Sequence, residues 1–509
     1  MRFRSLLIPS CVLAAAACAS EHGPLSNRMS EATTRYLSSA ARQPVGWQPW
    51  GRDAFALAAR LDRPVLLYVG AVDCRWCAMM DREVYANPAV GALIDSLYVP
   101  VRVDRDERPD VAARYEAALR SLAGLSGYPL TIVLTPDGSA FFGGTYLPAD
   151  DPVTGRGLLQ VLPEVAKDYR EHREFVVRRA ALVRQLALGE HTAVPGVLSS
   201  TAVRADIRAV RDSLGQALNS PSTLGGFLHT RAVALLLAEY GRSGDTAAFD
   251  IARRVLDYMI DSASAAGAEG VRDDPPAVVR AGLLHNLAVG WAFTGDARYR
   301  DGGERLLRLI EPEFEGGDDR VVFADRDAYV AGSALEAATA FGDSAAQRRA
   351  VGALDTLLHL VYHRGRGVRH APSGSIRGLL SDQVATAWAS LAAYRANGRR
   401  RYLDVALDLA GILQRDFADS TAGGYFDSAV LDPAAAALSD RTKGVLDDLL
   451  PGSNAWAAQV FLELADATGE RGYRQQAEAT LEAFAGVAAG GGVRASSYLA
   501  VAREALGGR

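Results

Sequence analysis

The sequence predicts a multi-domain protein in which an α/β domain is followed by an all-α domain of helical hairpins. Short apolar runs alternate with helix-forming segments between residues 46 and 150, which is the pattern of a sheet covered by helices. Beyond residue 200 the chain is rich in alanine and has almost no strand pattern. In that second part, a glycine followed by an acidic and then an aromatic residue recurs, which indicates repeated hairpins.

Composition limits the classes of function. A chain of 509 residues with 49% hydrophobic and 23% charged residues can build two or three globular domains. The 55 basic and 60 acidic residues give a net charge of −5. We therefore expect no nucleic-acid partner, because no basic excess is available to bind phosphates.

The first 17 residues have the pattern of a signal peptide. Basic residues precede an apolar run at 6–17, which is too short to span a bilayer. Small residues come directly before Cys18, as in a lipoprotein signal, so we expect Cys18 to carry a lipid that anchors the protein in the cell envelope of a bacterium. Ordinary cleavage near Ala19, giving a secreted soluble protein, is the alternative. Residues 18–45 are polar and are expected to form a tether.

The α/β domain is expected over residues 46–190. Turn residues at 135–138 predict a hairpin before the last strand. The apolar and helix-forming segments predict helices at 53–59, 78–85, 88–97, 111–122 and within 155–190, and strands at 64–70, 98–103, 130–134 and from 140.

The close cysteine pair Cys74 and Cys77 lies between the strand at 64–70 and the helix that follows it. A helix N-terminus stabilises a thiolate, and Arg75 adds a positive charge beside Cys74. A C-x-x-C at such a turn is typical of thiol–disulfide exchange, with Cys74 attacking and Cys77 resolving. If the signal is removed and Cys18 is modified, these two are the only remaining thiols.

Two other interpretations of the pair are open. A zinc site needs four ligands, but the sequence contains no second C-x-x-C, and no histidine except His22 lies within ninety residues on either side of the pair. A purely structural disulfide closing so small a loop would stabilise the fold little. We therefore favour redox exchange, and expect neither a metal nor an organic cofactor.

The order of these elements resembles that of thioredoxins. Residues 46–150 also resemble an uncharacterised branch of that superfamily, found in spermatogenesis-associated and bacterial proteins in which a thioredoxin domain precedes a helical toroid. The stretches that carry the resemblance are 74–80, 103–110, 127–131 and 142–148.

The resemblance implies further site residues. In thioredoxins the proline that corresponds to Pro129 is cis and lies against the active-site sulfurs, whereas an ordinary trans proline opening a strand is the alternative. The branch usually has Cys-His-Trp-Cys and Trp-Pro, so Trp76 is kept while Arg75 and Tyr128 are departures. Arg75 cannot replace the histidine as a proton carrier, because it does not deprotonate. We expect the loss of this histidine to affect the reduction potential of the cysteine pair, but not its capacity for thiol–disulfide exchange.

The acidic stretch at 104–110 could suggest a cation site. Arg105 and Arg108 are interleaved with its carboxylates, so we expect a self-paired, solvated loop instead.

A linker is expected at 191–200 and the helical domain at 201–509. Its repeats must stack into a solenoid or close into a ring, because one hairpin cannot bury its own apolar face. The resemblance implies an α/α toroid similar to six-hairpin glycosidases, although the family's His-Phe-Glu-Lys stretch has no convincing counterpart.

Carboxylates of the helical domain are candidates for a sugar site. Glycoside hydrolysis requires two opposed carboxyl groups, and the candidates are Asp382, Asp427, Asp447 and Asp448. His359 and His363 could place two ligands on one helix face, but surface histidines are favoured.

We expect an oxidoreductase that exchanges with client thiols or disulfides, and we expect its toroid to bind a glycan or peptide. A non-catalytic binding protein, or a glycosidase or epimerase, is the alternative.

Overall fold

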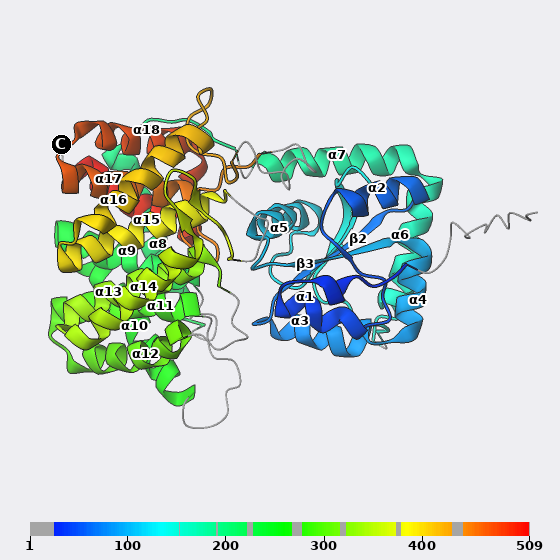
Figure 1. Ribbon diagram of the computed structural model, residues 1–509, viewed down its shortest axis with the longest axis horizontal. Helices are drawn as coiled ribbons and strands as arrows, with labels where there is room; N and C mark the ends of the chain where they lie inside the picture. Colours follow the sequence, from blue (N-terminus) through cyan, green and yellow to red (C-terminus); the bar gives the residue numbers. More distant parts are fainter. Residues whose placement is uncertain are drawn as a thin grey trace, which may run out of the picture.

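The computed structural model describes residues 25–151, 153–189, 192–220, 227–266, 277–315, 322–372, 378–429 and 441–507. Figure 1 shows an α/β domain beside a domain built of helices, in the order that the sequence predicts. The signal peptide and Cys18 lie outside the described residues. No helix within the described ranges is long and apolar enough to cross a membrane.

A five-stranded sheet forms the centre of the first domain, in the order β1-β3-β2-β4-β5. β2 and β3 run parallel, whereas β4 is antiparallel to β2 and β5 to β4. β2, β3 and β4 are buried along their whole length, which explains their continuous apolar runs. The strands are β1 Gln48–Pro49, β2 Val65–Gly70, β3 Val99–Asp104, β4 Leu130–Leu134 and β5 Ala140–Gly144.

Helices cover both faces of this sheet, as predicted. Alternate residues of β2 face opposite cores, so Tyr68 packs with α3, α4 and α6 while Leu67 packs with α2, α5 and α7. The predicted helix within 155–190 is two helices, because the chain leaves the helical conformation at His172. The helices are α2 Arg52–Leu61, α3 Arg75–Met80, the π-helix Asp81–Tyr85, α4 Pro88–Leu97, α5 Pro109–Ala123, α6 Leu158–Glu171 and α7 Arg173–Gly189.

The predicted tether is wrong for its described part, 25–45. Short helical segments Met29–Glu31, α1 Arg35–Ser38 and Ser39–Arg42 pack onto the sheet domain. The side chains of Met29, Tyr36 and Ala40 are buried in the same core as Tyr68. These turns are too short to produce a hydrophobic period, so the sequence pattern did not reveal them.

Residues 192–199 connect the domains without forming helix or strand. Gly196 N donates a hydrogen bond to the Glu482 carbonyl, and Gly486 N donates to the Val194 carbonyl. The connection is therefore held along the surface of the helical domain rather than projecting from it.

The helical domain is a closed ring. The inner helices contact one another in the order α9, α11, α13, α15, α17 and α19, and α19 returns to contact α9, while the even-numbered helices α8 to α18 pack outside. The predicted α/α toroid is therefore confirmed, with two short strands, β6 Tyr362–His363 and β7 Gly367–Val368, among the described residues. The helices are α8 Ser200–Ala217, α9 Phe227–Ser243, α10 Thr246–Ala266, α11 Ala277–Thr294, α12 Ala297–Glu315, α13 Ala324–Phe341, α14 Ser344–Val361, α15 Leu380–Asn397, α16 Arg400–Ile412, α17 Ser453–Thr468, α18 Arg471–Ala488 and α19 Ser496–Gly507.

The recurring glycine ends the inner helix of each hairpin. Gly244, Gly295, Gly342, Gly398 and Gly469 have φ values of 71°, 67°, 71°, 67° and 76°. This left-handed conformation is the usual helix C-cap, and it disfavours a side chain. The repeated glycine therefore marks the turn between the two helices of each hairpin in the ring.

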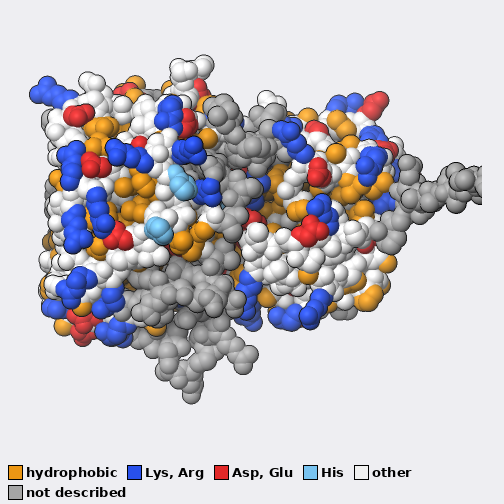
Figure 2. Space-filling model, viewed as in Figure 1, with side chains coloured by type: hydrophobic (Ala, Val, Ile, Leu, Met, Phe, Trp, Pro, Cys, Tyr) orange, Lys and Arg blue, Asp and Glu red, His pale blue; other side chains and the backbone are white. Residues whose placement is uncertain are grey.

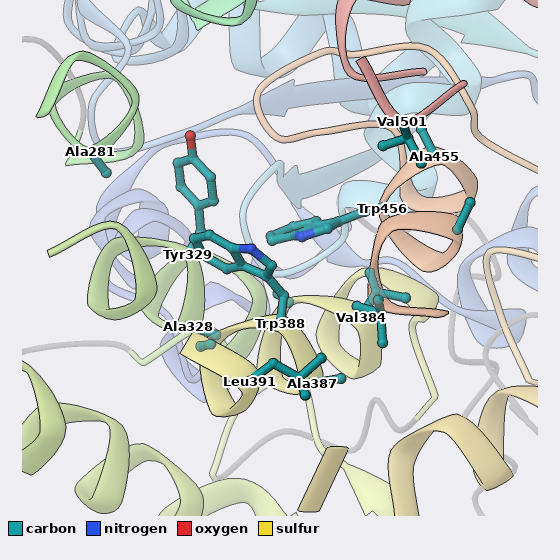
Figure 3. Close-up of a cluster of buried hydrophobic side chains, with 14 of the residues drawn as sticks. Ala281, Ala328, Tyr329, Val384, Ala387, Trp388, Leu391, Ala455, Trp456 and Val501 are labelled. Atoms are coloured by element: carbon teal, nitrogen blue, oxygen red, sulfur yellow. The ribbon is translucent and has the colours of Figure 1, made fainter. Parts of the chain in front are cut away.

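Aromatic rings fill the middle of the toroid (Figure 3). Tyr329, Trp388 and Trp456 come from three successive inner helices, and each pair of ring centroids is 5.7 Å apart. All three are at least 95% buried. A Cβ on Gly332 would lie 2.3 Å from the Trp388 ring, so this close packing requires glycine there.

Candidate functional site

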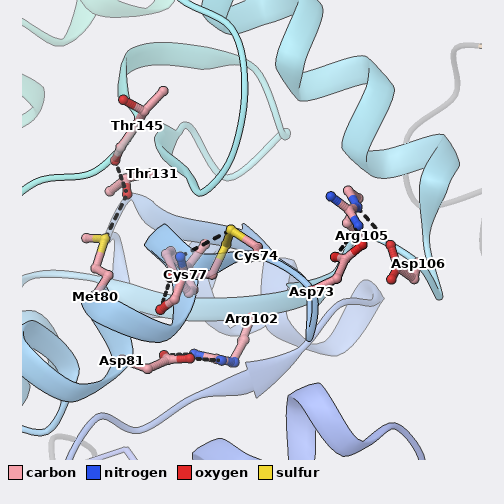
Figure 4. Close-up of a disulfide and its surroundings, with 11 residues drawn as sticks. Asp73, Cys74, Cys77, Met80, Asp81, Arg102, Arg105, Asp106, Thr131 and Thr145 are labelled. Carbon is pink, nitrogen blue, oxygen red and sulfur yellow. Dashed lines mark hydrogen bonds and ion pairs between the residues drawn. A yellow bond between two sulfur atoms is a disulfide. The ribbon is translucent and has the colours of Figure 1, made fainter. Parts of the chain in front are cut away.

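A disulfide joins Cys74 and Cys77 at the carboxyl end of β2 (Figure 4). Cys74 is the N-cap of α3, and its Sγ accepts a hydrogen bond of 3.1 Å from Cys77 N. The preceding strand ends at Gly70, where an added Cβ would lie 3.0 Å from Cys77 Sγ and 2.1 Å from the Tyr36 hydroxyl. Close packing at Gly70 therefore fixes the turn that carries the pair.

The two sulfurs have different access to solvent. Cys77 is fully buried in the core that contains Tyr68, whereas Cys74 is half-buried at the edge of that core. An incoming molecule can therefore reach Cys74 first, with Cys77 behind it. Arg75 is exposed at the first turn of α3.

Apolar side chains are exposed on the turn that carries the disulfide. Trp76 is 52% exposed, and its ring lies 5.4 Å from that of Tyr146, which is half-buried. Val72 on the same turn is also exposed. We call Val72, Trp76 and Tyr146 the apolar rim.

The peptide bond between Tyr128 and Pro129 is cis, as the resemblance implied. Leu130 pairs with Val69, so the cis bond lies beside the end of the strand that leads to Cys74. Pro129 is buried, and Tyr128 packs against the same core as Cys74. Both supporting residues are therefore close to the cysteine turn.

The loop at 104–110 is self-paired, but the prediction that it is solvated is wrong. Arg105 pairs with Asp106 at 2.8 Å and Arg108 with Asp110 at 2.6 Å, as expected. However, Asp104 is only 3% exposed, and Asp106 and Arg108 are also buried. The helical domain docks onto this loop, a contact that no local sequence pattern indicates.

Asp106 receives two contacts from the helical domain. Arg326 Nη2, at the start of α13, lies 2.5 Å from Asp106 Oδ1. His370 Nε2 lies 2.7 Å from the backbone carbonyl of Asp106. β2 and β3 are parallel, so the cysteine turn after β2 and the docking loop after β3 share one edge of the sheet. The cysteine pair and the toroid therefore meet at the same edge.

His370 lies in a buried cluster with Asp325 and Asp382, whose ligand atoms are all within 4.8 Å of one another. His370 Nδ1 is 2.8 Å from Asp382 Oδ1, while Nε2 faces the Asp106 carbonyl. Both ring nitrogens thus face acceptors, so both donate and the ring is an imidazolium. In that form it has no lone pair for a metal. The cluster is an ion pair within the helical domain, and its imidazolium also donates a hydrogen bond to the α/β domain.

Electrostatics agree with this assignment. Burial alone would lower the pKa of His370, but the carboxylates of Asp382 and Asp325 outweigh it and raise the pKa to about 10. Burial raises the pKa of Asp382 to about 6, although His370 opposes that shift. The sequence indicated Asp382 but not His370, which belongs to no recognisable motif.

The four predicted toroid carboxylates do not form one site. Asp382 belongs to the ion-paired cluster, and Asp447 is fully buried, accepting hydrogen bonds from Gly452 N and Ser497 N. Of the four, only Asp427 and Asp448 are among the residues that line the cavity of about 170 Å³ between α5 and the loop at 442–453. Two of the four candidates are therefore structural.

The two histidines considered as metal ligands, His359 and His363, are exposed at the end of α14 and in β6. Figure 2 shows histidine side chains at the surface of the helical domain.

A second carboxylate pair, which the sequence did not indicate, lies farther along the inner helices. Glu336 of α13 and Glu463 of α17 both pair with Arg395 of α15. Burial raises the pKa of Glu463 to about 7. Burial acts in the same sense on Glu336, but its hydrogen bond with His285 and the nearby cations outweigh it and lower its pKa. The Arg395 guanidinium bridges the two carboxyl groups, so it occupies the space between them.

Comparison with known proteins identifies relatives of the first domain. Residues 26–187 match the family model described as "Thioredox_DsbH: Protein of unknown function, DUF255". The chain is 34% identical over 201 residues to the uncharacterized protein B0495.5 of Caenorhabditis elegans, covering 40% of this chain and 27% of that protein. It is 35% identical over 157 residues to the human spermatogenesis-associated protein 20, covering 31% of this chain and 20% of that protein. The chain thus spans about a quarter or less of these relatives. The expected resemblance is confirmed for this domain.

Among solved structures, an unsaturated glucuronyl hydrolase specific for heparin is similar with a TM-score of 0.44 and 13% identity. The similarity covers 56% of this chain and 84% of that one.

Proposed function

Taking residues 26–187 as a member of this thioredoxin-like family, we propose that the protein is a thiol–disulfide oxidoreductase whose redox pair is Cys74 and Cys77. The observation that carries the proposal is the asymmetry of the pair. The half-exposed Cys74 lies at a helix N-terminus, with the buried Cys77 directly behind it. A helix N-terminus stabilises a thiolate, and a thiolate is the attacking species in exchange.

The reaction proceeds in two displacements. In the reduced protein, the Cys74 thiolate attacks one sulfur of a client disulfide, forming a mixed disulfide and releasing the client's other sulfur as a thiolate. The Cys77 thiolate then attacks Cys74 Sγ, which forms the Cys74–Cys77 disulfide and releases the second client thiolate. The client is thereby reduced and the protein oxidised. The same steps in reverse oxidise a client dithiol, and the reduction potential determines the direction.

The apolar rim supports a polypeptide client. Trp76 and Tyr146 provide aromatic surface beside Cys74, and the segment before β4 offers backbone next to it. An extended chain that carries a cysteine can lie over such a surface while its sulfur reaches Cys74. The helical domain docks at the same edge of the sheet, and we assign it a role in holding the client polypeptide or an attached glycan.

The chemistry suits an oxidising compartment outside the cytoplasm. The apolar run at 6–17 and the small residues before Cys18 support export and lipid attachment there. Membrane fractionation and the mass of the mature N-terminus test this part of the proposal separately.

Exchange is tested with the purified full chain and a disulfide-containing peptide. Wild-type protein should reduce the peptide in the presence of a thiol reductant, and Cys74→Ser should abolish the reaction. Cys77→Ser should accumulate a mixed disulfide that a non-reducing gel and mass spectrometry detect. Equal, slow reaction of both cysteines with the peptide would contradict the proposal.

A further inference from the structure

Arg105 joins three parts of the molecule at the redox edge. Its Nη2 lies 2.5 Å from Asp73 Oδ1, and Asp73 directly precedes Cys74. Its Nε donates to Asp106 at 2.8 Å, and its guanidinium lies 5.1 Å from the centre of the Tyr128 ring. One side chain thus contacts the residue before the attacking cysteine, the residue before the cis proline, and the loop that binds the toroid. Figure 4 shows its contacts with Asp73 and Asp106.

The helical domain holds Asp106, the residue of the 104–110 loop with which Arg105 is paired. Asp106 Oδ1 is shared between Arg105 and Arg326 of α13. His370 donates to the carbonyl of the same residue. Asp106 is 9% exposed, and its position therefore depends on the docked toroid. A shift of the toroid would move Asp106 and, with it, the guanidinium that Asp106 orients.

We propose that Arg105 is a positioning residue through which the docked helical domain sets the reactivity of Cys74. This inference rests on the proposed redox function and adds its regulation. Asp73 directly precedes Cys74, so its carboxylate places a negative charge near the forming thiolate, and its ion pair with Arg105 compensates that charge. Whatever weakens the contact between Arg105 and Asp73 leaves two negative charges as neighbours, which disfavours the thiolate. The toroid is the part of the chain that can modulate this contact.

The physical argument gives the sign of each effect. Arg105→Ala should raise the pH at which Cys74 is alkylated, because the thiolate loses a nearby cation. It should also make the reduction potential more negative, because destabilising the thiolate destabilises the reduced protein. Asp73→Asn should act in the opposite direction. The double variant should fall near wild type, because neither charge then remains.

The test follows alkylation of Cys74 against pH in the reduced full chain. We expect a midpoint shift of about 0.5 to 1 pH unit for Arg105→Ala, and a smaller shift of the same sign for Arg326→Ala. Arg105→Lys should partly rescue the midpoint, because it keeps the charge without the planar fork. Arg82→Ala is the matched control, since it removes an exposed arginine from the π-helix that continues α3.

The outcomes separate the two proposals. If wild-type protein performs no exchange, the redox function fails. If exchange occurs and Arg105→Ala leaves both midpoint and potential unchanged, or shifts them no more than Arg82→Ala, the positioning role is overturned alone. If Arg105→Ala shifts the midpoint but Arg326→Ala does not, the link to the toroid is overturned. Circular dichroism of each variant identifies a shift that is caused by unfolding.

Discussion

His370 of the helical domain donates from Nε2 to the backbone carbonyl of Asp106 in the α/β domain, over 2.7 Å and 264 positions of sequence. The same ring is ion-paired through Nδ1 with Asp382. One imidazolium therefore connects the N-terminal end of α15 to the loop after β3. The toroid and the α/β domain are joined by a buried charge rather than by apolar packing alone.

This contact predicts a pH-dependent stability. The pKa of His370 is raised from its ordinary value of 6.5 to about 10. Because its pKa is higher in the folded protein, the protonated His370 ring stabilises the fold fully below pH 6.5. This contribution to the free energy of unfolding is lost as the pH rises from 6.5 through 10. The wild-type unfolding midpoint should therefore fall between pH 7 and 10 more steeply than that of His370→Gln. The raised pKa of Asp382, about 6, acts below this window.

At neutral pH the same variant should be destabilised by about 3–5 kcal/mol, because it leaves the Asp382 carboxylate buried without its cation. Thermal and urea unfolding of the full chain measure both effects. His359→Gln, at an exposed position of α14, is the matched control and should change neither. An unchanged pH slope in His370→Gln would show that the ring is neutral in the folded protein.

The aromatic centre of the toroid predicts opposite effects for two glycines. Gly332→Ala should destabilise the helical domain by about 1–3 kcal/mol, because the new methyl group would lie 2.3 Å from the rigid Trp388 ring. Gly352→Ala in α14 should stabilise it by about 0.5–1 kcal/mol, because no atom lies within 4 Å and alanine favours helix. Urea unfolding compares the two. Equal effects would mean that the centre is loosely packed.

The apolar rim predicts a change in client affinity without a change in thiol chemistry. Trp76→Ala should raise the KM for a disulfide peptide about tenfold, corresponding to about 1.4 kcal/mol of lost contact, while Cys74 alkylation stays near wild type. The reason is that the Trp76 side chain is 52% exposed, and its ring contacts Tyr146. Leu309→Ala, an exposed apolar residue of α12, serves as the control. A fall in kcat at unchanged KM would instead assign Trp76 to the chemical step.

The elements of the α/β domain could be predicted from sequence because each has a local signal. α4 begins at Pro88 after the Asn87 cap, and the run before Cys74 is buried on both faces. The glycine repeat likewise revealed the ring, because each glycine adopts a local left-handed turn. The role of His370, by contrast, depends on partners such as Asp106, which is far away in the sequence and meets the ring only when the domains dock. Neither the residues next to His370 nor its spacing from other polar residues predicts these partners. The burial of 104–110 was missed for the same reason.

The last prediction is that the toroid does not hydrolyse glycosides. Hydrolysis requires an acid and a base or nucleophile about 5–10 Å apart with the scissile bond between them. Asp447 is occupied by backbone donors and Asp382 by His370, while Arg395 lies between Glu336 and Glu463. Of the predicted carboxylates, Asp427 and Asp448 remain, on a cavity of about 170 Å³ that the α/β domain partly encloses and that Glu116 also lines. We therefore expect no release from aryl-glycosides or oligosaccharides by the full chain, assayed from pH 4 to 8. Turnover that disappears in Asp427→Asn but persists in Asp416→Asn, a surface control, would show that this cavity is an active site.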